Sequence, residues 1–143
     1  MTFAELKDQV SVLLIGDNPL PKDNSKQIAA LKLAYIEIAD MASPLKWLTL
    51  NKDVSIMRKA MGSYFIRMPN VPVDDTDELD IDSELVPAVA RLLASYIAKE
   101  IRMKDYHRSL AKDILKKYEA KVRAFMLQQE KAGEYDNIGC DYA

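Results

Sequence analysis

The segment Glu84–Ile101 constrains the fold of this chain more than any other, because apolar side chains cover it on nearly every side. They recur at helical spacing and leave hardly any polar face: Leu85, Val86, Val89, Ala90, Leu92, Leu93, Tyr96, Ile97 and Ile101. A helix that is apolar nearly all round is a buried one, so this segment is expected to form the centre of the core. Asp82 or Ser83 is expected to start the helix. Pro87 suits only a first turn, so the regular helix begins as late as Glu84 or kinks there.

Two helices are predicted before this segment. Thr2 and Glu5 fit a capping box, and the apolar residues behind them predict a first helix to about Ile15. A second helix is predicted to begin at residue 24 or 25 and to end before Pro44. Its apolar stripe follows a three-four alternation and faces one side: Ile28, Leu31, Tyr35, Ile38 and Ala42.

A long final helix is predicted from about Asp105 to Ala132, where Gly133 is expected to stop it. Its predicted buried stripe is Tyr106, Leu110, Ile114 with Leu115, Tyr118, Val122 and Phe125. About 28 residues make a helix of about 42 Å, which is longer than a domain of this size needs. The C-terminal part of this helix is therefore expected to project or to meet a neighbour, and residues 133–143 are expected to form an irregular tail.

Between residues 45 and 69 the apolar period changes from helical to alternating. Val54–Met57 and Ser63–Arg67 are β-prone, and Gly62 lies between them where a tight turn needs a glycine. We predict an inserted β-hairpin here, with a further strand at Lys46–Leu50. A hairpin alone is marginally stable in water, so it must pack on helices or pair with another chain.

The predicted fold class is mainly α: a four-helix core with a central buried helix and an inserted short β-hairpin. The chain has 143 residues, the size of one ordinary domain. Residues 1–132 are expected to form that domain, with an acidic loop at residues 71–82. No stretch reaches the roughly 18 apolar residues that span a bilayer, and the N-terminus does not fit a signal peptide. We therefore expect synthesis in the cytosol and no membrane partner.

The acidic loop contains seven acids and no base when it is counted to Glu84: Asp74, Asp75, Asp77, Glu78, Asp80, Asp82 and Glu84. Spaced oxygen ligands can hold Ca²⁺, but the glycine that such a loop needs for its turn is missing, and Leu79 and Ile81 interrupt the spacing. We favour a solvated loop that caps the following helix, and predict no metal site. A divalent-metal-binding protein remains an alternative.

Catalytic devices are hard to build from this sequence. His107 is the single histidine and Cys140 the single cysteine, and neither they nor Ser109 lies in a nucleophile motif. We expect His107 at the surface or boundary of its helix and Cys140 as an incidental exposed thiol. Glycine-rich phosphate-binding patterns are also missing. We predict no enzymatic activity, no catalytic residue and no cofactor.

The centre of the chain resembles the head-to-tail adaptor, or connector, proteins of tailed bacteriophages. The resemblance covers about Leu45–Val122 and rests on the succession Val54–Arg58, Gly62–Pro69, Val71-Pro72, Asp80–Asp82 and Glu84–Ala90, followed by Tyr106-His107 and a final amphipathic helix. It implies a structural protein of the virion neck that forms a ring, commonly twelve-fold. Such a ring binds the portal protein and a downstream neck or tail protein. It also continues the channel through which double-stranded DNA passes without sequence-specific binding.

Surfaces around the core are the expected partner-binding sites. Acids at 74–84 could pair with bases of a neighbouring subunit at 99–131, where ten bases stand against five acids. The partner-binding residues expected on the hairpin, long helix and tail are Met61, Gly62, Tyr64, Lys116, Lys117, Lys121, Tyr135, Ile138 and Tyr142. A non-viral helical binding module without catalysis is the competing hypothesis, and it should be a monomer or dimer in solution.

Overall fold

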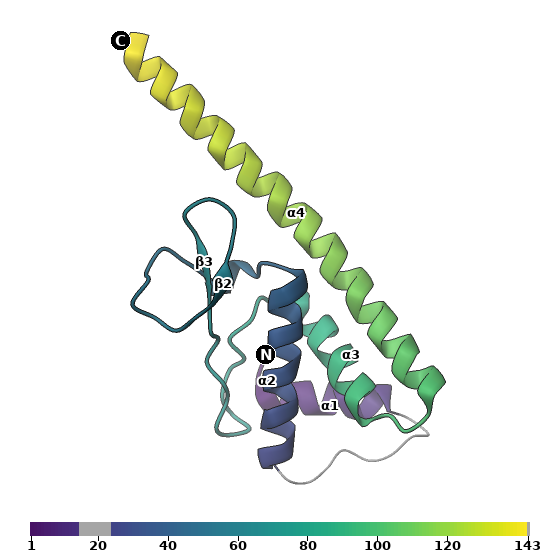
Figure 1. Cartoon of the computed structure of the whole chain (residues 1–143). Helices are drawn as coiled ribbons and strands as arrows, with labels where there is room; N and C mark the ends of the chain where they lie inside the picture. The colour runs from purple at the N-terminus through teal and green to yellow at the C-terminus, as the bar shows by residue number, and fades with distance from the viewer. Residues whose placement is uncertain (15–23, 143) are drawn as a thin grey trace.

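The computed structural model describes residues 1–14 and 24–142, and side chains as far as residue 128. Four α-helices pack together, and a small sheet lies at one side of them (Figure 1). The elements, with two short 3₁₀ helices written η, are α1 Phe3–Leu13, α2 Asn24–Met41, η1 Leu45–Trp47, β1 Leu48–Thr49, β2 Ile56–Lys59, β3 Phe65–Arg67, η2 Ser83–Leu85, α3 Val86–Ile97 and α4 Ile101–Tyr142. The predicted fold class, mainly α with an inserted hairpin, is confirmed.

Helix α3 is the centre of the core, as its apolar sequence predicts. It packs against α1, α2 and α4, and eight of its residues are buried: Val86, Ala88, Val89, Ala90, Leu92, Leu93, Ala94 and Ser95. Its bounds are narrower than predicted. Pro87 lies in its first turn, where a missing amide costs nothing. The backbone becomes extended at Ala98, so the apolar run through Ile101 divides between two helices that fold back on each other.

Local signals at the first two helices are confirmed. Thr2 and Glu5 form the predicted capping box of α1. The inward face of α2 is buried along the predicted stripe. The end of α2 has a partner that the sequence did not indicate: Arg58 of β2 donates to the carbonyls of Ala39 and Ala42, the latter at 2.8 Å. A cation at a helix C-terminus satisfies free carbonyls and opposes the negative end of the dipole.

The sheet has three antiparallel strands in the order β1-β3-β2. Ile66 in the middle strand pairs with Leu48 on one side and Arg58 on the other, and Gly62 makes the turn with a positive φ of 64°. The hairpin is therefore confirmed. The third strand is present but shorter than predicted, because Leu45–Trp47 form η1 and β1 covers only Leu48–Thr49. Trp47 anchors the sheet to α2, because its buried ring meets Tyr35 edge-on with centroids 5.2 Å apart.

The buried stripe of α4 is rotated from the predicted one in its first half. His107, Ala111 and Leu115 are buried with Tyr118 and Val122, whereas Tyr106 is 53% exposed. His107 is only 2% exposed, so the prediction of a surface or boundary position is wrong. Arg91 of α3 explains how a polar ring can be buried here, since its Nη1 lies 3.0 Å from His107 Nδ1.

Helix α4 extends well past the rest of the molecule (Figure 1). It begins four residues before the predicted start and continues to Tyr142, so the helix does not end at Gly133 and residues 133–142 are not irregular. A glycine inside a helix costs only about 1 kcal/mol relative to alanine, and no proline follows to stop the helix. The side chains of Tyr135, Ile138 and Tyr142 lie outside the described residues.

Candidate functional site

The acidic loop, Val71–Asp82, lies against the start of α1. The carbonyl of Asp77 accepts the amide of Phe3 at 3.0 Å, and the carbonyl of Asp75 accepts the amide of Ala4 at 3.0 Å. The first amides of a helix have no acceptor within that helix, so the loop supplies the acceptors that α1 lacks. The loop is therefore part of the fold, and the prediction of a solvated loop is wrong in this respect.

Apolar side chains of the acidic loop join the core. Leu79 and Ile81 are buried, and the indole Nε1 of Trp47 donates to the carbonyl of Asp80 at 2.5 Å. The acids at 78, 80 and 82 alternate with these apolar residues and remain at least partly exposed. Extended backbone sends successive side chains to opposite sides, which explains why a run of acids can pass over a hydrophobic core.

Asp80 joins the acidic loop to the sheet. Its carboxylate accepts two hydrogen bonds from Arg67 of β3, at 2.6 and 2.8 Å, and a third from the amide of Asn70 at 2.8 Å. The bond from Arg67 is the main reason that the pKa of the Asp80 carboxyl lies below its usual value, and the Asn70 amide adds to it. The same Arg67 guanidinium donates to the carbonyl of Lys46 at 2.8 Å.

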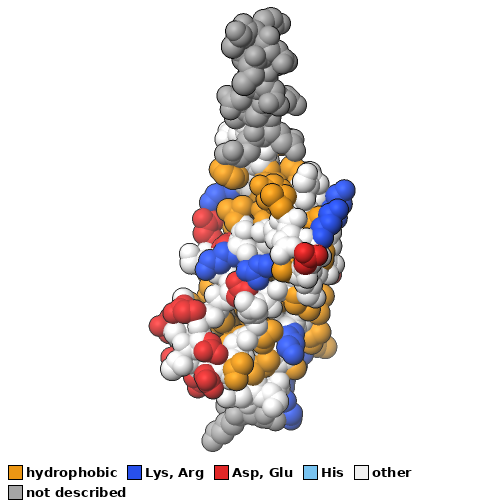
Figure 2. Space-filling view, turned by 90° about the vertical axis from the view of Figure 1, so that its left-hand side faces the viewer, with side chains coloured by type: hydrophobic (Ala, Val, Ile, Leu, Met, Phe, Trp, Pro, Cys, Tyr) orange, Lys and Arg blue, Asp and Glu red, His pale blue; other side chains and the backbone are white. Residues whose placement is uncertain are grey.

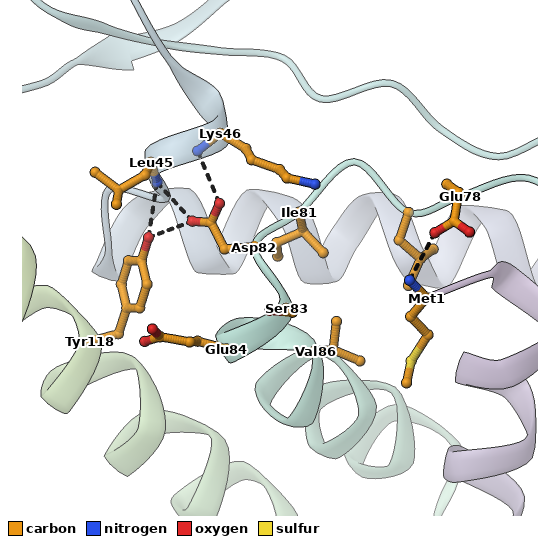
Figure 3. Close-up of a pocket in the computed structure, with 11 residues that line it drawn as sticks. Met1, Leu45, Lys46, Glu78, Ile81, Asp82, Ser83, Glu84, Val86 and Tyr118 are labelled. Atoms are coloured by element: carbon orange, nitrogen blue, oxygen red, sulfur yellow. Dashed lines mark hydrogen bonds and ion pairs between the residues drawn. The ribbon is translucent and has the colours of Figure 1, made fainter.

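Asp82 binds η1 instead of capping η2. Its carboxylate accepts the amides of Leu45 at 2.8 Å and Lys46 at 3.1 Å, and the phenol of Tyr118 from α4 donates to the same group (Figure 3). Asp82 stands at the N-cap position of η2, as predicted, but its side chain makes no capping bond to the start of that helix. Burial, with this contact second, raises the pKa of Tyr118 above its usual value.

A pocket of about 450 Å³ lies beside these groups. Figure 3 shows Asp82 and Tyr118 at one end, the Met1 ammonium bound to Glu78 at the other, and Ile81 between them. The Met1–Glu78 ion pair spans 2.8 Å. Asp82 binds two backbone amides and the Tyr118 phenol, and Glu78 binds the Met1 ammonium. These contacts join the N-terminus, the acidic loop and α4.

The carboxylates of the acidic loop do not converge. Asp75 pairs with Lys7 at 2.6 Å, and Asp77 accepts the amides of Val73 and Asp74. These two amides, Asp74 first, lower the pKa of the Asp77 carboxyl. Among the residues that the structure describes, no three acids, histidines or cysteines come close enough to hold a metal ion.

An apolar groove of about 690 Å³ lies where the sheet meets the outer part of α4. We call it the α4 groove; its lining residues are Leu50, Met61, Gly62, Ser63, Tyr64, Phe125 and Met126. Figure 2 shows hydrophobic side chains gathered directly below the part of α4 whose side chains are not described. Leu50 is 61% and Phe125 50% exposed. The predicted partner-binding residues Met61, Gly62 and Tyr64 thus come together in one site.

The three predicted lysines do not share one surface. Lys121 pairs with Glu84 of its own chain at 3.1 Å. Lys116 lies with Lys112 and Asp113 along a shallow polar depression on α4. Successive residues of a helix differ by about 100° in direction, so Lys116 and Lys117 point to different sides.

The α4 half of the groove was not predicted from the sequence. Phe125 continues the apolar stripe of the long helix and was expected to be buried with it, yet burial ends at Val122. Periodicity shows which side of a helix is apolar, but it does not show where the neighbouring elements end. Leu50 was predicted as the last residue of a strand, whereas β1 ends at Thr49 and leaves Leu50 exposed beside the groove.

Comparison of the chain with family models, with curated proteins and with solved structures finds no match in any of the three. No helix in the described part of the chain is both long and apolar enough to cross a bilayer.

Proposed function

We propose that this chain is a head-to-tail adaptor of a tailed bacteriophage, a structural protein of the virion neck. In this proposal it forms an oligomeric ring, commonly of twelve subunits, between the portal protein and a downstream neck or tail protein. The ring continues the channel through which double-stranded DNA passes. The resemblance across Leu45–Val122 supports the proposal, and the α4 groove is the observation that carries it.

The α4 groove supports a binding function because its apolar residues are left open to water. Leu50, Tyr64 and Phe125 are exposed together along the groove, and contact with a partner would remove their apolar surface from water. Phe125 and Met126 of the groove precede the end of α4 that extends past the rest of the molecule (Figure 1). A neighbouring subunit or the portal could therefore contact the groove and the helix together.

Apolar contact supports ring assembly better than the charge pairing that the sequence suggested. Asp75, Glu78 and Asp80 pair with Lys7, the Met1 ammonium and Arg67 of the same chain. A carboxylate already paired within its subunit gains little from a second cation at the surface. In a heterologous ring, the groove of one subunit would instead receive an apolar surface of the next.

The test is binding to the portal ring of the same virus. The wild-type chain should form a ring-shaped complex with it, seen by negative-stain microscopy and by sedimentation. Phe125→Ser combined with Tyr64→Ser should abolish this complex while the variant stays folded by circular dichroism. Val12→Ser is the matched control, because Val12 is 63% exposed on α1 and lies outside the groove.

Absence of any complex with the wild-type chain would overturn the adaptor proposal. If the Tyr64→Ser, Phe125→Ser variant still forms the complex, the α4 groove is not the surface that binds the portal.

A further inference from the structure

Helix α2 has a second apolar face that the core does not use. Its inward face, represented by Leu31, Tyr35 and Ile38, is buried. On the opposite side Ala29, Leu33 and Ile36 are exposed, with Leu33 at 56% and Ile36 at 43%. At about 100° per residue these positions, spaced by four and three, form one stripe.

This outward stripe, which we call the α2 stripe, has a charged residue at each end. Lys26 precedes Ala29 by three positions, and Asp40 follows Ile36 by four, so both continue the same spacing. Both side chains are exposed. Within the part of the chain that the structure describes, neither makes an ion pair or a side-chain hydrogen bond.

The order of these residues makes the α2 stripe complementary to itself in one orientation. Lys26 and Asp40 are each seven residues from Leu33. Two antiparallel copies that meet at Leu33 place Lys26 of one helix opposite Asp40 of the other, twice. Two parallel copies would bring Lys26 to Lys26 and Asp40 to Asp40, which repel.

We propose that two copies of this chain associate through α2, antiparallel, about a two-fold axis at Leu33. Leu33 and Ile36 of both copies form the apolar centre, and Lys26 and Asp40 form an ion pair at each end. This is an isologous contact, in which the same patch serves both subunits. It uses no residue of the α4 groove and does not depend on the adaptor function.

The α2 pair is a small interface, so its association is weak and depends on concentration. Helix α2 has 18 residues, which corresponds to about 27 Å of contact at 1.5 Å per residue. One helix from each partner covers less than the roughly 1,200 Å² of the usual stable complex. We expect monomer at low micromolar concentration and dimer toward millimolar concentration.

Sedimentation equilibrium of the full chain over that range of concentration tests the pair. Leu33→Glu should leave only monomer, because it places two carboxylates on the axis. Val12→Glu changes a similarly exposed apolar residue on α1 and should leave the dimer intact. A wild-type chain that stays monomeric throughout, or equal loss of dimer in both variants, would overturn the proposal.

Charge reversal tests the antiparallel order. Lys26→Glu alone and Asp40→Lys alone should each weaken association about tenfold, since each places like charges at both ends of the pair. The double variant, Lys26→Glu with Asp40→Lys, should recover the wild-type affinity. If the double variant instead loses as much affinity as the two single variants combined, this arrangement is excluded.

Cross-linking tests the axis directly. In a Cys140→Ser background, Leu33→Cys should oxidise to a covalent dimer, because the two thiols face each other across the axis. Val12→Cys is the control, and equally fast dimer formation there would contradict the model of a specific pair. The Leu33→Glu variant should still bind the portal ring. If the wild-type chain forms the α2 dimer but does not bind the portal, the adaptor function is overturned and the α2 pair is not.

Discussion

The acidic loop and the α4 groove differ in whether their side chains have partners within the same chain. The loop is rich in charge, but Asp75, Glu78 and Asp80 bind partners in the same chain. The groove has almost no charge, and Leu50 and Phe125 have half or more of their surface in water. A charged segment can thus serve the fold of its own chain, whereas exposed apolar residues remain available to a second molecule.

The largest effect that separates the two regions should come from their apolar residues. Ile81→Ala, in the acidic loop, should lower the free energy of unfolding by about 3 kcal/mol, because it leaves a cavity at a buried position. Phe125→Ala, in the groove, should lower it by less than about 1 kcal/mol, since that residue is half exposed. Urea unfolding of both variants measures the difference. Equal losses would remove the distinction between the loop and the groove.

A smaller loss of folding stability is expected when Asp80 is replaced. Asp80→Asn should lower the free energy of unfolding by about 2 kcal/mol at neutral pH, because the hydrogen bonds from Arg67 lose their charged acceptor. Asp74→Asn is the control within the loop, since the Asp74 side chain accepts no hydrogen bond from the described residues. A loss in the control as large as that in Asp80→Asn would show that net charge, not the Arg67 contact, stabilises the loop.

The Asp80 carboxyl also sets how the free energy of unfolding changes with pH. The pKa of Asp80 is lowered in the folded chain, so the unfolded chain takes up a proton first as the pH falls. The Arg67–Asp80 contribution is therefore complete above the ordinary aspartate pKa of about 4 and is lost as the pH falls through the lower, folded value. Urea unfolding between neutral pH and pH 3 should show this loss in the wild type and a shallower one in Asp80→Asn.

Much of the fold could be predicted because its signals are local. The capping box at Thr2, the turn at Gly62 and the apolar run at the centre of α3 each depend on residues within a few positions. The face of α4 could not be predicted in the same way. Two apolar stripes lie about 100° apart on that helix, and contact with α3 selects the one that contains His107.

The candidate sites could be predicted only in part, for a related reason. Met61, Gly62 and Tyr64 are adjacent in sequence, and a turn places them together. The contacts of the acidic loop join residues about 70 positions apart, such as Asp77 with Phe3. Composition shows that the loop carries acids, but it does not show which amide or cation each acid meets.

The smallest effect is expected at Glu84 and Lys121, the ion pair that links the acidic segment to the basic surface of α4. Both side chains are more than half exposed, so Glu84→Gln should change the free energy of unfolding by less than about 0.5 kcal/mol. Portal binding of the variant should be unchanged at low and at high salt if assembly uses the apolar α4 groove. If the variant instead bound the portal markedly more strongly or more weakly than the wild-type chain at low salt, the acids and bases would be shown to pair between subunits. Charge would then contribute to assembly as well as to the fold.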